Sequence, residues 1–264
     1  MSEESGYFLE NSTGAAGRRL TALAALFDPW TFTHLDSIGL GPGWKCWEVG
    51  AGGSSVIRGL SERVGPTGTV LATDIDIRWA AAGSMSNVTV LQRDVATDEP
   101  SDTGFDLVHA RLVLVHVTDR DRALINMISA LRPGGWLVVE DADPGLQPLS
   151  CLEPTTEQEL LANRIRTGFR SLMAERGADL AYGRKLPTLL RKAGLIGVRA
   201  DAYFPVSQPE CAILELATIS IIRDQLILAG IVTAEEVDRH CQAVADGLLD
   251  IAQPPLICAW GQCN

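Results

Sequence analysis

Short apolar segments alternate with amphipathic helical patterns through the middle of the chain. Each apolar segment is rich in valine and leucine and has the length of a buried strand. These segments span residues 44–49, 69–74, 87–92, 105–110 and 135–141. Strands that alternate with helices form a parallel sheet with right-handed crossovers and helices on both faces. The pattern therefore predicts an α/β fold whose ligands bind at the carboxyl ends of the strands.

Two amphipathic helices are expected between these strands. The first carries its apolar face between residues 56 and 64 and stops at Gly65. The second is expected to begin at Thr118, with Asp121 in the capping-box position, and to end at Pro133–Gly134. Both would pack on the sheet through their apolar faces.

Helical patterns also fill both ends of the chain. One covers residues 15–27, before the first strand. Two others begin at capping boxes, Thr156 with Glu159 and Thr233 with Glu236. A strand-like segment at 196–206 lies between these two helices.

The apolar stretch 211–228 predicts a helix, although its ISII segment also favours a strand. This stretch would lie either in the core or at a subunit interface, so a homodimer is one expected state. We expect a single domain over residues 1–264. Its expected parts are a helical arm at 1–40, a cofactor-binding core at 41–141, and substrate-covering helices with the last strands at 142–264.

Composition and charge narrow the function classes. The net charge of −11 would repel a nucleic acid, and no basic run overrides it, so we expect no nucleic-acid partner. The six cysteines are scattered without metal-binding spacing, which is typical of free thiols in a reducing compartment. No signal peptide is evident, and no segment reaches the roughly eighteen apolar residues of a membrane span. We therefore expect a cytoplasmic protein without a membrane partner.

A glycine-rich turn joins the first strand to the following helix. Gly50 and Gly52 would let the backbone turn sharply and approach a ligand, where the helix N-terminus presents free N–H groups. Glu48 precedes the turn, and Asp74 ends the second strand, where a carboxylate can accept ribose hydroxyls. The negative charge of Glu48 beside the turn would attract a cofactor that carries a sulfonium and an ammonium group, and it would repel a pyrophosphate.

The ordered segments EVGAGG, ATDID, LQRDV, FDLVHARLVLVHV and LRPGGWLVVED resemble class I methyltransferases, most closely bacterial enzymes for small molecules. The resemblance covers about residues 41–141. It implies a Rossmann-like sheet of seven strands and S-adenosyl-L-methionine as the cofactor. The chain departs from the family pattern at Ser54–Ser55, where the third glycine of the turn is replaced.

The resemblance also implies contacts with each end of the cofactor. Asp74 would hold the ribose, Ile75 would lie beside the adenine, Asp94 would accept a hydrogen from the adenine amino group, and Val95 would supply a backbone N–H. At the methionine end, Glu48 would orient the ammonium group. The remaining residues expected at the cofactor are Gly50, Ala51, Gly52, Ala110, Arg111 and, from the N-terminal arm, Tyr7.

Two residues are candidates for acid–base help during methyl transfer. His116 follows the fourth strand and Asp141 ends the fifth, so both could reach the acceptor. A packing role for His116 is an equal alternative, and His109 is expected to be structural within its strand. Asp141 also belongs to a carboxylate cluster with Glu140 and Asp143 that could hold a divalent metal, but no supporting ligand set is evident, and we expect no metal.

These observations predict an enzyme that methylates a small-molecule acceptor, with oxygen favoured slightly over nitrogen or carbon and secondary metabolism as one setting. A second hypothesis is a cofactor-binding protein or non-methylating catalyst that retains the fold. A nicotinamide-dependent oxidoreductase is disfavoured because the YxxxK pair is missing. An enzyme that methylates nucleic acid or protein typically has a basic groove or an NPPY-like motif after the fourth strand. This chain has HARL at 109–112 instead, so that class is disfavoured.

Overall fold

The computed structural model describes residues 14–80, 83 and 85–264, and these divide into two compact units. The first unit comprises residues up to 26, 143–180 and 204–255; the second comprises residues 27–142, 181–203 and 256–264. Helix α1 (Gly14–Ser37) begins in the first unit and ends in the second. The expected single domain with three parts stays a prediction. Tyr7 lies outside the described residues.

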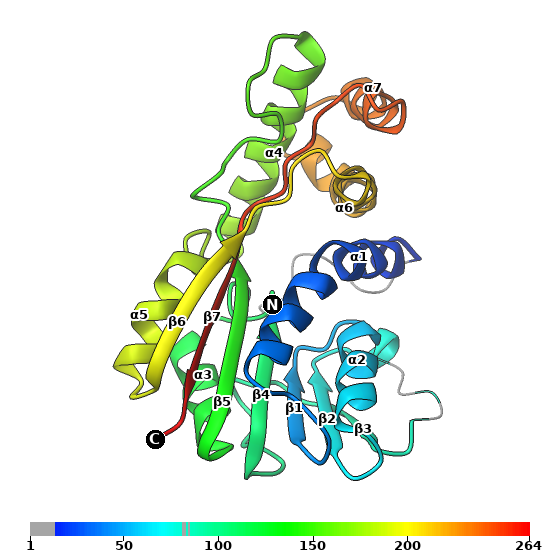
Figure 1. The fold of residues 1–264 in the computed structure, drawn as a ribbon. Coiled ribbons are helices and arrows are strands. Elements are labelled where there is room, and N and C mark those ends of the chain that lie inside the picture. The colour runs from blue at the N-terminus through cyan, green and yellow to red at the C-terminus, as the bar shows by residue number, and fades with distance from the viewer. Residues whose placement is uncertain (1–13, 81–82, 84) are drawn as a thin grey trace, which may run out of the picture. The chain divides into compact units, whose positions relative to one another are not determined.

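The second unit contains one seven-stranded sheet in the order β3-β2-β1-β4-β5-β7-β6, which Figure 1 shows. β7 runs antiparallel to both of its neighbours, and the other pairs are parallel. This confirms the predicted Rossmann-like α/β fold. The strands are β1 (Lys45–Val49), β2 (Thr69–Asp74), β3 (Val88–Gln92), β4 (Phe105–Arg111), β5 (Leu131–Ala142), β6 (Ile196–Tyr203) and β7 (Leu256–Gln262).

Helices cover both faces of this sheet because side chains alternate along each strand. On one face, Leu35 of α1 and Leu60 of α2 (Ser55–Val64) pack with apolar strand residues such as Leu107. On the other face, Met127 of α3 (Arg120–Ser129) and Leu190 of α5 (Leu186–Lys192) pack with a second set. Short 3₁₀ turns, η1 (Ile77–Trp79) and η2 (Gly183–Lys185), complete the unit.

The first unit is built mainly from three helices, α4 (Glu157–Glu175), α6 (Pro209–Leu228) and α7 (Ala234–Ala245). Their apolar side chains form a core of their own. Three buried charged or ionisable side chains lie together beside this core: Arg166 Nη2 is 3.1 Å from Glu215 Oε2, and His240 Nε2 is 3.0 Å from Glu215 Oε1. No helix within the described part of the chain is long and apolar enough to cross a membrane.

Several local signals of the sequence are confirmed. The capping boxes at Thr156 and Thr233 both form, with Glu159 and Glu236 returning a hydrogen bond to the cap residue. The stretch 211–228 is helical within α6, so the β-forming ISII segment is overruled by its helical surroundings.

The predicted bounds of two helices are wrong. The helix expected at 15–27 continues to Ser37 through Pro29, which lies inside it. The helix expected from Thr118 to Pro133–Gly134 begins at Arg120, because the Asp119 side chain accepts the N–H of Arg122 instead. It ends at Ser129, and Pro133–Gly134 lie in β5 near a register shift against β4.

Candidate functional site

The glycine turn lies at the carboxyl end of β1, in the second unit. Gly50 and Gly52 both take the left-handed backbone conformation, with φ of 62° and 57°, which favours glycine. A Cβ on Gly50 would come within 2.3 Å of Cγ2 of Val113, on the segment after β4. Any other residue at Gly50 would therefore be strained twice. Ala51, between the two glycines, donates its N–H to the Thr73 carbonyl at the end of β2.

Asp74 joins this turn to the end of β2. Its Oδ2 accepts the Gly52 N–H over 2.8 Å, and its Oδ1 accepts the Asp76 N–H over 2.8 Å. Burial raises the pKa of this carboxyl despite these hydrogen bonds. Each oxygen keeps a further lone pair, so the carboxylate can still accept hydrogen bonds from a ligand.

The residues expected at an adenine lie beyond Asp74. Ile75 directly follows this buried carboxylate and is 52% exposed, so its apolar side chain is accessible to a ligand. Asp94 Oδ1 accepts the Ala96 N–H over 2.8 Å, so this carboxylate shapes its own loop. The carbonyl of Val95 accepts a hydrogen bond from Asn126 of α3, which fixes the same loop to the domain.

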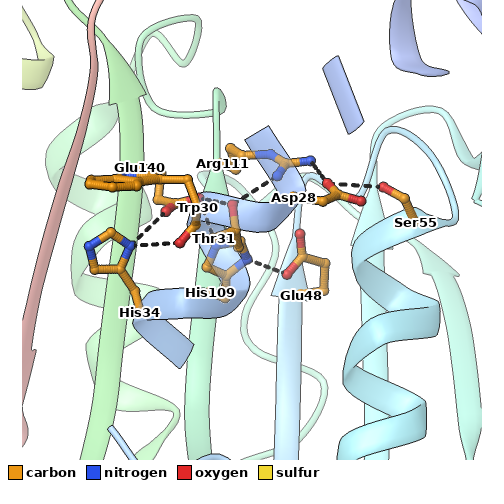
Figure 2. A network of polar contacts seen from close by, with 9 residues as sticks. All are labelled: Asp28, Trp30, Thr31, His34, Glu48, Ser55, His109, Arg111 and Glu140. Atoms are coloured by element: carbon orange, nitrogen blue, oxygen red, sulfur yellow. Dashed lines mark hydrogen bonds and ion pairs between the residues drawn. The ribbon is translucent and has the colours of Figure 1, made fainter. Parts of the chain in front are cut away.

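Glu48 is buried and pairs with a histidine on the neighbouring strand. Nδ1 of His109 lies 2.6 Å from Glu48 Oε2, as Figure 2 shows. Burial alone would disfavour the charged imidazolium, but Glu48 and Glu140 together raise the pKa of His109 to about 9. Burial also raises the pKa of Glu48, and His109 opposes that shift. The predicted structural place of His109 within its strand is confirmed.

Arg111 ends β4 and is held by α1. Its guanidinium donates to Oγ1 of Thr31 and to Oδ1 of Asp28, each over 2.8 Å (Figure 2). Thr31 in turn donates to Glu140 Oε2 over 2.5 Å. Burial acts to raise the pKa of Glu140, but the neighbouring His109 acts to lower it. The pKa of Glu140 is lowered overall. The Thr31 hydroxyl thus links a cation to a carboxylate.

Asp28, Thr31 and His34 were not among the residues expected at the site. They are spaced three apart, which places them on one face of α1. This polar stripe is a signal that the sequence carried. The helical pattern was recognised only over residues 15–27, so the three residues were assigned to the helical arm at 1–40 and not to the site.

The two predicted catalytic residues occupy different settings. Asp141 is buried at the end of β5, and its Oδ2 accepts the Val115 N–H over 3.3 Å. Burial raises its pKa well above the ordinary value. His116 is half-buried in the segment after β4. This segment begins with Leu112 at φ 57°, a strained conformation for a non-glycine residue.

Two other expectations concern neighbouring residues of β4 and β5. Ala110 is buried in the sheet, opposite Val49 and Val139. Glu140 and Asp141 are adjacent in β5, so they point to opposite faces. Glu140 faces α1, whereas Asp141 holds the segment after β4, and the two do not converge on one point.

One part of the chain matches a known protein family. Residues 47–137, which include the turn, Asp74 and the whole of β4, match the methyltransferase domain family. This part of the second unit is therefore similar to methyltransferase domains.

Among curated methyltransferases, the ubiquinone/menaquinone biosynthesis C-methyltransferase UbiE of Laribacter hongkongensis is 32% identical over 126 residues. That match covers 46% of this chain and 52% of the relative, so the chain spans about half the length of the curated relatives it matches. The Haemonchus contortus phosphoethanolamine N-methyltransferase 2, solved in complex with S-adenosyl-L-methionine, shares the fold with a TM-score of 0.62 and 16% identity. That alignment covers 100% of this chain and 62% of the other.

A solved [4+2]-cyclase, SpnF, also has this methyltransferase fold. Its TM-score is 0.52 at 17% identity, and the alignment covers 90% of this chain and 81% of the cyclase. The fold is therefore shared by proteins whose names state N-methylation and cyclisation.

Proposed function

We propose that this chain binds S-adenosyl-L-methionine and transfers its methyl group to a small-molecule acceptor. The observation that carries the proposal is the hydrogen bond between the Gly52 N–H and Asp74, which lies inside the matched family region. This hydrogen bond brings the glycine turn and a buried carboxylate together at the carboxyl ends of β1 and β2, where α/β sheets bind nucleotides.

The residues present fit this cofactor. Asp74 has lone pairs left for the two ribose hydroxyls, and Ile75 presents an apolar side chain beside it for the adenine. Asp94 and the N–H of Val95 are proposed to take the adenine edge, and the backbone of Gly50–Gly52 the methionine part. The other proposed contacts at the methionine end are Glu48, Ala110, Arg111 and Tyr7.

When bound, the cofactor supplies a methyl group on a positively charged sulfonium. The chain's own contribution is a positioned and dry site, because methyl transfer needs little covalent help from the protein. Glu48 and Glu140 place carboxylates near the turn and the end of β4, with His109 between them. Their buried charges favour a cationic ligand in their neighbourhood.

His116 and Asp141 are proposed to assist the acceptor. His116 would take a proton from an acceptor that arrives protonated. Asp141 would hold the segment after β4, which carries His116, because its carboxylate accepts the Val115 N–H. We expect His116→Ala to lower the rate of methyl transfer while the dissociation constant for the cofactor stays unchanged. Full activity in this variant would remove His116 from the mechanism.

The methylated atom is proposed to be oxygen rather than nitrogen or carbon. The names of the relatives state carbon and nitrogen, so the atom must be read from the product. Mass spectrometry and NMR of a product labelled in its methyl group would give it directly. Secondary metabolism as a setting and a homodimer as the working state are parts of the same proposal.

The proposal is tested by binding and by turnover. Calorimetry should show one site for S-adenosyl-L-methionine per chain, and NAD should not compete for it. A panel of phenols, amines and enolisable carbonyl compounds, incubated with cofactor labelled in the methyl group, should reveal labelled product. Absence of S-adenosyl-L-methionine binding would contradict the proposal.

A second function is favoured by one comparison. Because a [4+2]-cyclase has the same fold over most of its length, a catalyst that keeps the cofactor without using its methyl group is the alternative. It would show cofactor binding, no labelled product with any acceptor, and consumption of a substrate without change in mass.

A further inference from the structure

A polar row crosses four strands of the sheet in the second unit. The strand registers place Arg111 opposite Glu140, Glu140 opposite Cys258, and Cys258 opposite Asp201. Residues directly opposite one another in a sheet point to the same face. Glu140 bonds to Thr31 of α1, so the row faces that helix.

His34 of α1 lies over the end of this row. Its Nε2 is 3.0 Å from Asp201 Oδ2. One ligand atom each from His34, Asp201 and Cys258 lies within 4.8 Å of the other two. Imidazole nitrogen, carboxylate oxygen and cysteine sulfur thus converge from α1, β6 and β7.

The orientation of the His34 ring is fixed by the helix itself. Nδ1 lies 2.9 Å from the Trp30 carbonyl, one turn earlier, so it carries a hydrogen that it donates. A histidine that binds a metal almost always donates its second N–H to a carbonyl or carboxylate in this way. Nε2 is then the ring nitrogen left to bind a metal ion, and it is the atom that faces Asp201 Oδ2.

The surroundings favour a cation. Glu140 Oε1 is buried without a hydrogen-bond partner among the residues that the structure describes, and it lies 3.9 Å from His34 Nδ1. Cys258 is buried, with Glu140 opposite it on β5 and Asp201 opposite it on β6, so two carboxylates flank its sulfur. Their negative charges would stabilise a divalent ion bonded to that sulfur.

We propose that His34, Asp201 and Cys258 form a three-ligand site for a zinc-type transition-metal ion. The mixed nitrogen, oxygen and sulfur set matches the ligands that zinc takes, and water would complete a tetrahedral site from the Asp201 side, whose side chain is 43% exposed. On binding, the Cys258 thiol loses its proton to solvent and a metal–sulfur bond forms. The ion would tie α1 to β6 and β7.

The site goes beyond methyl transfer and does not depend on it. The sequence gives no sign of it, because its three residues come from segments that are far apart in the chain. The other reading of the same geometry is an ordinary ion pair between His34 and Asp201, with Cys258 as an inert buried thiol.

The test uses the full chain, freed of metal by a chelator and titrated with Zn²⁺ and with Co²⁺. We expect one tight site per chain, release of about one proton per Zn²⁺ in calorimetry across buffers, and a thiolate-to-Co²⁺ charge-transfer band. Cys258→Ser should abolish the band and weaken Zn²⁺ binding by at least about 100-fold, since even the loss of outer partners of a metal site costs about 10- to 100-fold. Cys46→Ser is the matched control: Cys46 is also a fully buried strand cysteine, and this variant should keep both the band and the affinity.

Asp201→Asn provides a second variant, because Asp201 is partly exposed and its replacement should leave folding intact, as circular dichroism would verify. It should weaken Zn²⁺ binding by about 10-fold or more. A wild-type chain that binds no Zn²⁺ tightly, or a cobalt band that survives in Cys258→Ser, would overturn the proposal in favour of the ion pair.

Discussion

The Gly52 N–H lies 2.8 Å from Oδ2 of Asp74, so the glycine turn after β1 and the end of β2 are fixed to each other by one hydrogen bond. The same carboxylate is proposed to hold the ribose of the cofactor. Asp74 therefore has two tasks, which different substitutions separate.

Asp74→Ala should weaken binding of S-adenosyl-L-methionine by more than about tenfold, because a charge-assisted hydrogen bond contributes about 1.5 to 3 kcal/mol. Asp74→Asn keeps an oxygen that can accept the Gly52 N–H but removes the charge, so it should give an intermediate affinity. Asp102→Ala removes an exposed carboxylate that pairs with Lys45, and it should leave affinity unchanged. Calorimetry on all three decides this, and unchanged affinity in Asp74→Ala would show that the ribose is held elsewhere.

Thr31 offers a test of the link between α1 and the strand ends. Thr31→Val removes the hydroxyl that joins Arg111 to Glu140, leaving two buried charged groups short of a partner. The free energy of unfolding should fall by about 1 to 3 kcal/mol in urea titrations. Thr33→Val, an exposed position on the same helix, is the control and should change it by less than about 0.5 kcal/mol. Equal effects from the two substitutions would contradict a special role for Thr31.

His109 predicts a pH dependence of stability. Its pKa is raised from 6.5 to about 9 in the folded chain, so its protonation contributes stability that is fully present below about pH 6.5. That contribution is lost as the pH rises through about 9. His109→Gln can keep a hydrogen bond to Glu48 but cannot titrate. Its loss of free energy of unfolding relative to wild type should therefore be largest near pH 6 and smaller by about pH 9.5. Urea titrations at the two pH values measure it, and a constant deficit would mean that His109 is neutral in the folded chain.

Asp141 distinguishes a positioning role from a chemical one. Asp141→Asn keeps an oxygen for the Val115 N–H, whereas Asp141→Ala leaves that buried donor unpaired and should cost about 1 to 3 kcal/mol of stability. If Asp141 acts only by holding the segment after β4, Asp141→Asn should retain most of kcat. A large loss of kcat in Asp141→Asn, with stability and cofactor affinity kept, would instead make the carboxyl a participant in the reaction.

The sequence predicted those parts of the fold and site that depend on neighbours along the chain. The strands at 69–74 and 105–110, the capping boxes and the turn around Gly50 each carry their signal within a few residues. Residues whose role depends on pairing across the sheet were harder to place. His109 was expected inside a strand, but its partner Glu48 could be identified only once β1 and β4 were seen in register.

The contribution of α1 shows why such sites escape sequence reasoning. Pro29 lies inside this helix, although proline lacks an N–H and disfavours the helix interior. The helix passes through it and brings three polar side chains over the sheet. Their partners on β4, β5 and β6 lie between 80 and 167 residues away along the chain, a relationship that no local pattern encodes.

Glu215 in the first unit gives a prediction that is independent of the site. It is buried and accepts hydrogen bonds from Arg166 and His240. Burial acts to raise its pKa, but Arg166 and His240 outweigh burial and lower the pKa from 4.5 to about 2. Because the folded pKa is depressed, the stability it contributes is present above about pH 4.5 and is lost as the pH falls towards 2.

Glu215→Gln leaves Arg166 buried without its counter-charge and should destabilise the chain by about 3 to 5 kcal/mol at neutral pH. The difference in free energy of unfolding between wild type and variant should decrease between pH 4.5 and the lowest pH at which the wild type still folds, because wild-type Glu215 then loses its charge as well. Glu210→Gln, in the first turn of the same helix, is the matched control and should cost no more than about 1 kcal/mol. Denaturant titrations across this pH range provide the measurement. A deficit in Glu215→Gln that stays constant with pH would show that the charge of Glu215 is not what stabilises the first unit.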